Sequence, residues 1–258
     1  MTEQQRNRLN TIIEDGYQFD LGEYISKGAS LFQKSAGNFI GFAFLAGMIL
    51  SVASFIPIIG SILTNLVLSP ALFVGGYLAA HKLNNKEPLE FGTFFKGFDH
   101  VGQLALAALV TNLILFATFI PLLAVWYMYG ATDWLYDIFS NPVMAGEPPS
   151  FPVWSFLLTL PAIYLSIAYA WSYLFIAFYG MDFWEAMESS RKIISKKWGI
   201  FFLFLLILGL MAALGFLFFF VGALVTFPIL ICANYAAFAE VTELLAEQED
   251  DLVEHLID

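Results

Sequence analysis

The chain has 258 residues, of which 59% are hydrophobic and 13% are charged, and its formal net charge is −11. Soluble domains carry about twice this share of charged residues, so the composition excludes an ordinary soluble domain and predicts that lipid covers much of the surface. The acidic balance also argues against a nucleic-acid partner, because phosphate binding needs clustered cations.

The polar N-terminal segment, residues 1–18, predicts a short cytoplasmic helix with Leu9, Ile12 and Ile13 on one side. No short apolar run with a cleavage site follows it. We therefore expect no removable signal peptide and a first span that acts as an uncleaved anchor.

Long apolar stretches make up most of the remaining chain. A helix that crosses about 30 Å of hydrocarbon needs roughly 20 such residues. The sequence therefore predicts an all-α membrane protein with six transmembrane helices, near residues 38–57, 60–82, 102–129, 152–180, 199–219 and 221–241. The single cysteine, Cys232, lies inside the last span and is interpreted as a small apolar side chain.

All eleven Lys and Arg residues lie in three regions, 6–34, 82–96 and 191–197. Lys and Arg near membrane spans are retained on the cytoplasmic side. We therefore predict that all three regions and both termini are cytoplasmic.

The turns on the opposite side carry no charge. Segments 57–61 and 219–222 are short and apolar, and they fit either full hairpins or re-entrant hairpins that stop short of the far surface. The longer outer segment, 130–151, contains several aromatic residues, which predicts a short helix in the headgroup layer.

Parts of the chain repeat. Segment 19–23 matches 181–185 at an offset of 162 residues, and Tyr77 matches Tyr235 after a four-residue deletion. A weaker copy begins at Glu90. These matches predict three units, each an interfacial amphipathic helix followed by a two-span hairpin, with bounds 19–82, 90–180 and 181–242. An even number of spans per unit makes the repeats parallel.

The helix that leads each unit carries apolar residues on one face, with lysines on the other face of the first and third. This pattern is typical of a helix lying in the cytoplasmic interface, where lysines meet anionic headgroups; the alternative is a collar that packs on the spans. The candidate lipid contacts are Lys27, Lys34, Lys96, Arg191, Lys192, Lys196 and Lys197.

Three short runs look familiar: Phe19-Asp20-x-Gly22-Glu23, the run 91–98 (FGTFFKGF), and Glu185-Ala186-Met187-x-Ser189-Ser190. Together they resemble uncharacterised bacterial six-span integral membrane proteins, similar to the membrane domain that precedes some glycerophosphodiester phosphodiesterases. The resemblance implies a location in the bacterial inner membrane and offers no catalytic residues to transfer.

The sequence offers no catalytic, cofactor or metal site. His81, His100 and His255 lack a second ligand at metal spacing, and no nucleophile signature occurs. The spans contain no ionisable residue near their centres, which weighs against an ion-coupled carrier. The polar residues at depth are Asn65, Thr111, Asn112 and Asn234, and they fit either interhelical hydrogen bonds or a small polar cavity.

The C-terminal segment 243–258 is an acidic tail, which either docks on basic helices or is solvated. We expect a non-enzymatic membrane component that binds lipids or a partner, which would be another protein or a second copy. The alternative is a carrier or flippase for a neutral or amphiphilic small molecule. A membrane enzyme acting on lipid is the third and weakest interpretation.

Overall fold

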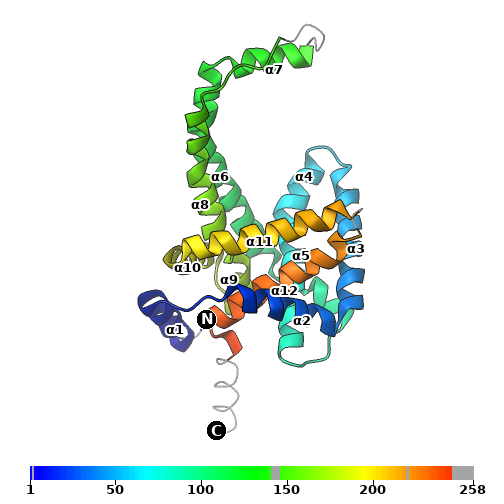
Figure 1. The fold of residues 1–258 in the computed structure, drawn as a ribbon. Coiled ribbons are helices and arrows are strands. Elements are labelled where there is room, and N and C mark those ends of the chain that lie inside the picture. The colour runs from blue at the N-terminus through cyan, green and yellow to red at the C-terminus, as the bar shows by residue number, and fades with distance from the viewer. Residues whose placement is uncertain (2, 141–145, 219–220, 246–258) are drawn as a thin grey trace. The chain divides into compact units, whose positions relative to one another are not determined.

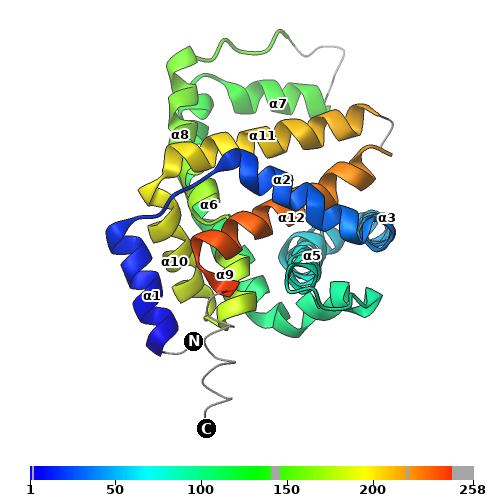
Figure 2. The same cartoon turned by 60° about the horizontal axis from the view of Figure 1, so that its bottom comes forward.

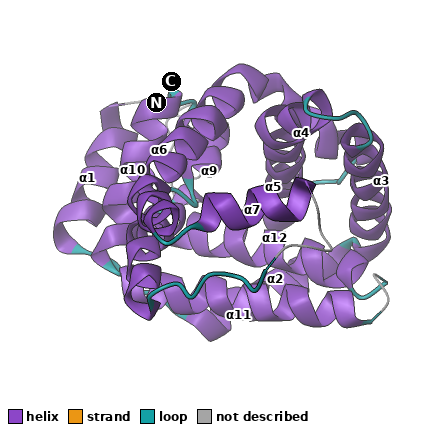
Figure 3. Ribbon diagram, turned by 90° about the horizontal axis from the view of Figure 1, so that it is seen from above, coloured by secondary structure: helices purple, strands orange, loops and turns teal. Residues whose placement is uncertain are grey.

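Every regular element in the described part of the chain is a helix. The computed structural model describes residues 1, 3–140, 146–218 and 221–245, and no strand occurs in these ranges (Figures 1 and 3). The predicted all-α class is therefore confirmed. Part of the turn predicted at 219–222, and all but the first three residues of the acidic tail, lie outside the described residues.

The helices follow one another with short connections. In chain order they are α1 (Glu3–Asp15), α2 (Leu21–Lys34), α3 (Ala36–Ser54), α4 (Ile59–Leu63), η1 (Thr64–Leu68), α5 (Ser69–Asn84), η2 (Phe91–His100), α6 (Val101–Met128), α7 (Ala131–Ser140), η3 (Val153–Thr159), α8 (Leu160–Ala168), α9 (Ser172–Tyr179), α10 (Phe183–Lys196), α11 (Trp198–Leu217) and α12 (Ala223–Val241).

Among the described residues, six helical stretches are long and apolar enough to cross a membrane, and each coincides with a predicted span. They are Ala36–Ser54, Ile59–Asn84, Phe91–Met128, Val153–Tyr179, Trp198–Leu217 and Ala223–Val241. This pattern indicates a multi-pass membrane protein. The third stretch begins earlier than predicted because the 3₁₀ helix η2 runs directly into α6.

The internal contacts divide the chain into two compact units, residues 1–108 with 168–258 and residues 109–167. In the second unit Trp126 stacks on Phe151 at 4.7 Å between ring centroids, and its indole Nε1 donates to Ser155 Oγ at 3.3 Å. The helix predicted within 130–151 is present as α7, with its Phe139 side chain exposed.

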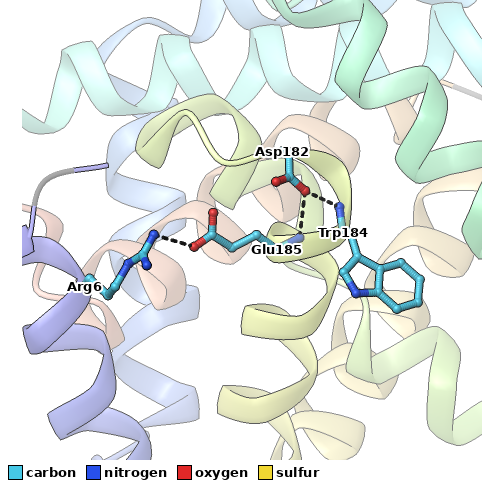
Figure 4. A network of polar contacts seen from close by, with 4 residues as sticks. All are labelled: Arg6, Asp182, Trp184 and Glu185. Atoms are coloured by element: carbon cyan, nitrogen blue, oxygen red, sulfur yellow. Dashed lines mark hydrogen bonds and ion pairs between the residues drawn. The ribbon is translucent and has the colours of Figure 1, made fainter.

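Two leading helices, α2 and α10, begin with the same device. The Asp20 carboxylate accepts a hydrogen bond from the Glu23 N–H at 2.9 Å. The Asp182 carboxylate accepts from the Trp184 and Glu185 N–H groups at 2.9 and 3.0 Å (Figure 4). An N-cap aspartate satisfies N–H groups that have no partner in the first turn, which is why both helices start where they do.

The apolar faces of the leading helices are buried against other helices of the same chain. Helix α2 packs along α12, as Figure 2 shows, η2 packs along α5, and α10 packs along α9. A Cβ on Gly28 of α2 would lie 2.5 Å from the Ala233 backbone, so only glycine permits this approach. The amphipathic pattern is therefore used for packing on the spans.

The helix of the fourth predicted span is interrupted. A turn at 169–171 separates α8 from α9. Ser190 of α10 bridges the break: its hydroxyl donates to the Ala168 carbonyl at 2.7 Å and accepts from the Trp171 N–H at 3.1 Å. A side chain from another helix thus satisfies backbone groups that a break in a span would leave unpaired.

A second irregularity precedes Pro70, which stands in the first turn of α5. Proline has no N–H to donate to the preceding turn. The residues just before it, Thr64–Leu68, form a π-helical turn in which the Ser69 N–H donates to the Thr64 carbonyl. The helix therefore continues past the proline with a locally wider turn.

Candidate functional site

A buried amide joins three elements in the first unit. The Trp171 indole Nε1 donates to Asn234 Oδ1 at 3.0 Å, and Asn234 Nδ2 donates to the Tyr77 hydroxyl at 2.9 Å. Trp171 is fully buried and Asn234 is 9% exposed. The amide therefore links α5, the start of α9 and α12, and its role in this arrangement is interhelical hydrogen bonding.

The other predicted polar residues occupy different surroundings. Asn65 is exposed, and its Nδ2 donates to the Ser61 carbonyl of its own helix at 2.8 Å. Thr111 is half-buried and Asn112 is exposed, both in the second unit. Within the first unit, Asn65 and Asn234 thus make separate hydrogen bonds and do not form one cluster.

A second polar contact lies nearby on α5 and α12. His81 Nδ1 is 2.7 Å from the Tyr235 hydroxyl, and Asn84 Nδ2 donates to the same hydroxyl at 3.4 Å. The Phe178 ring of α9 packs on both His81 and Tyr235, at 5.0 and 5.8 Å between centroids. His81 is therefore held between helices.

An apolar pocket of about 610 Å³ lies in the first unit. Its described walls come from α3, α5, α12 and the end of α11, and the only polar side chains among them are Ser51 and Ser69. Volumes of about 300–1,000 Å³ are typical of small-molecule sites. All of its lining residues except Val221 belong to helices of the candidate spans.

The pocket is long, and aromatic side chains border one end of it. Its lining runs along α3 from Phe39 to Val52, about 20 Å at the rise of an α-helix. At the first end, Phe42 stacks on Phe94 at 4.4 Å between centroids, and Phe39 meets Phe94 edge-on at 5.1 Å. Phe39 and Phe94 are fully buried, so an aromatic layer forms the floor.

Five of the seven cations predicted to contact lipid are engaged within the protein. These contacts are Lys27 Nζ to Glu240 Oε2 (3.2 Å), Lys34 Nζ to the Leu83 carbonyl (3.3 Å), Arg191 Nη2 and Lys192 Nζ to Glu188 Oε1 (2.7 and 3.5 Å), and Lys197 Nζ over the Tyr17 ring (5.5 Å to its centroid). Lys96 and Lys196 are exposed, and their ammonium groups contact no carboxylate among the described residues.

Three ionisable groups outside the spans have shifted pKa values. Hydrogen bonds from Arg191, together with the charges of Arg191 and Lys192, lower the pKa of Glu188 below its ordinary value. Burial raises the pKa of the Tyr24 phenol to about 12 and also raises that of Tyr17, whose hydroxyl donates to the Ile193 carbonyl at 2.9 Å.

A polar cavity of about 460 Å³ lies between α1 and α10. At its edge Arg6 Nη2 donates to Glu185 Oε1 at 3.1 Å, beside the Asp182 cap and the exposed Trp184 (Figure 4). Cations and carboxylates both line this cavity. Its charges are therefore largely balanced within the protein.

The described residues offer no group of three or more His, Cys, Asp or Glu side chains that could hold a metal ion. Comparisons with protein-family models, with curated proteins and with solved structures find no match to this chain.

Proposed function

We propose that this protein is a non-enzymatic membrane component that binds lipid, with an acyl chain held in the apolar pocket between α3, α5 and α12. The observation that carries this proposal is the pocket itself, which has about 610 Å³ of space and no charged residue in its described lining. A pocket of that chemistry along membrane-spanning helices favours an apolar ligand supplied by the bilayer.

Lipid is as apolar as the pocket, so moving a chain from the bilayer into it gains little hydrophobic free energy. Retention would come from close packing against the aromatic floor of Phe39 and Phe42 and from polar contacts to the headgroup. A long apolar site with aromatic side chains at one end suits an extended chain.

The membrane orientation and the internal repeats belong to the same proposal. We place the three basic regions and both termini in the cytoplasm, and the protein in a bacterial inner membrane. Two observations support three parallel units. The helices α2 and α10 share an aspartate cap, and α2, η2 and α10 each pack on the second span of another unit, α12, α5 and α9 respectively. Lys96 and Lys196 are then the best-placed contacts for anionic headgroups.

Native mass spectrometry of the protein in mild detergent tests lipid retention. Gly47 lines the pocket, and a Cβ there would meet nothing within 4 Å. Gly47→Trp should fill the pocket and abolish retained lipid. Leu45→Trp, on the same helix but outside the pocket, should leave retention unchanged. Equal lipid in both variants would contradict the proposal.

A carrier or flippase for a neutral or amphiphilic molecule is the second candidate. The observation that favours it is the break at 169–171, because interrupted spans line the substrate sites of many transporters. Vesicles containing the protein would move a fluorescent lipid between leaflets if this were correct. If the protein retains lipid but does not move it between leaflets, lipid binding stands and the carrier or flippase is excluded.

A further inference from the structure

Two serines, Ser51 and Ser69, are the polar side chains of the pocket wall. A hydroxyl within an apolar helix can donate a hydrogen bond to a carbonyl three or four residues earlier in the same helix. Ser54 does this with the Leu50 carbonyl at 2.8 Å, and Thr118 with that of Leu115 at 2.6 Å. Ser51 and Ser69 line the pocket, and their hydroxyls make no such hydrogen bond among the described residues.

Ser69 stands at a special place in its helix. It directly follows the π-helical turn Thr64–Leu68 and precedes Pro70. Single π turns inside α-helices occur frequently at functional sites. Here the turn coincides with a half-buried hydroxyl in the pocket wall.

The segments that frame the pocket carry no charge. Residues 35–80 and 198–239 contain no Asp, Glu, Lys, Arg or His. The nearest preceding cation, Lys34, donates to the Leu83 carbonyl. A phosphate or carboxylate drawn into the pocket would therefore lose its water without meeting a countercharge, which is costly in an apolar site.

We propose that the pocket selects an uncharged lipid whose head offers a hydroxyl or ester carbonyl, such as a diacylglycerol, and that Ser69, assisted by Ser51, hydrogen-bonds that head. This inference rests on the proposed lipid-binding function and names its ligand class. The acyl chain points toward the aromatic floor of Phe39 and Phe42, and the polar head stays at the level of the serines.

The test is a competition between two lipids that differ only in a phosphate. The protein in mild detergent is incubated with equal amounts of dioleoylglycerol and dioleoylphosphatidic acid, and the retained lipids are quantified by mass spectrometry. Dioleoylglycerol should be retained about tenfold or more over the acid. Ser69→Ala should lower its retention about twofold to tenfold, the effect of one hydrogen bond.

Two variants serve as controls. Ser69→Thr keeps a hydroxyl and should retain dioleoylglycerol, whereas Ser54→Ala removes a hydroxyl that lies outside the pocket and should change nothing. An unchanged melting temperature shows that each variant is folded. Equal retention of the two lipids, or no effect of Ser69→Ala, overturns the inference and leaves lipid binding in place. Retention of neither lipid by the native protein overturns both.

Discussion

The amide of Asn234 provides the sharpest test of how this bundle is held together. Replacing Asn234 by Leu keeps a side chain of similar size and removes both of its hydrogen bonds. The indole N–H of the fully buried Trp171 then loses its acceptor, and the Tyr77 hydroxyl loses the donor that Asn234 supplied. The substitution should therefore destabilise the first unit.

The magnitude follows from these two losses. A buried donor left unsatisfied costs about 1–3 kcal/mol, and a lost neutral hydrogen bond costs about 0.5–1.5 kcal/mol. Side-chain hydrogen bonds in a membrane protein average about 0.6 kcal/mol each, because the unfolded chain in lipid also finds partners. We expect Asn234→Leu to lower the free energy of unfolding by about 1–3 kcal/mol.

Unfolding in mixed micelles with increasing dodecyl sulfate, followed by circular dichroism, measures this change. Asn65→Leu is the matched control, because its amide is exposed and bonds only to its own helix. It should shift the unfolding free energy by less than about 0.5 kcal/mol. Trp171→Phe removes the indole donor. Adding Asn234→Leu to this variant should therefore lower the free energy of unfolding by less than it does in the native protein, with a coupling energy of about 0.5–3 kcal/mol between the two sites. Equal losses in the two asparagine variants, or no coupling, would refute the reasoning.

Three further outcomes are expected. Gly28→Leu should destabilise the protein by about 1–3 kcal/mol, because the new side chain meets the backbone of α12. Gly209→Leu is the control and should not destabilise it, because a Cβ there would meet nothing within 4 Å. Equal melting temperatures of the two variants would count against the close approach of α2 and α12. Glu188 has a lowered pKa in the folded state, so its contribution to stability is full above its ordinary value of 4.5 and is lost as pH falls through the folded value. Glu188→Gln should therefore lower the melting temperature at neutral pH by an amount that shrinks as the pH falls below 4.5, and a deficit that stays the same in acid would exclude this linkage. Single cysteines at Lys86 and Glu147, in a variant without the native cysteine, should react with impermeant reagents from opposite sides of the membrane; labelling from one side would rule out the proposed topology.

The buried network could be predicted only in part. Asn234 was identified because an amide at depth in a span needs a partner. Trp171 was missed, although its position gave a signal: tryptophan in spans usually lies near the interface, and one about nine residues inside a predicted span end needs a partner for its N–H. The serines of the pocket gave no signal of their own, because nothing in the sequence distinguishes Ser69 from a serine that bonds to its own helix.

The amphipathic helices could also be predicted only in part. The apolar faces of α2 and α10 and their N-terminal aspartates could be recognised from residue spacing alone. The surface that those faces cover could not, because a lipid headgroup layer and a neighbouring span accept the same apolar residues. The close approach of Gly28 to Ala233 is a property of two helices more than two hundred residues apart.

By itself, the sequence determined the helical class and the six apolar stretches, because in hydrocarbon each span must pair its own backbone groups within itself. That requirement is local, so about 20 consecutive residues suffice to express it. Tertiary structure alone decided the partners of Asn234, which lie 63 and 157 residues away, and the pocket formed by α3, α5 and α12. Those features depend on how distant helices pack, and packing is fixed by shape and close contact across the fold rather than by the order of residues along one helix.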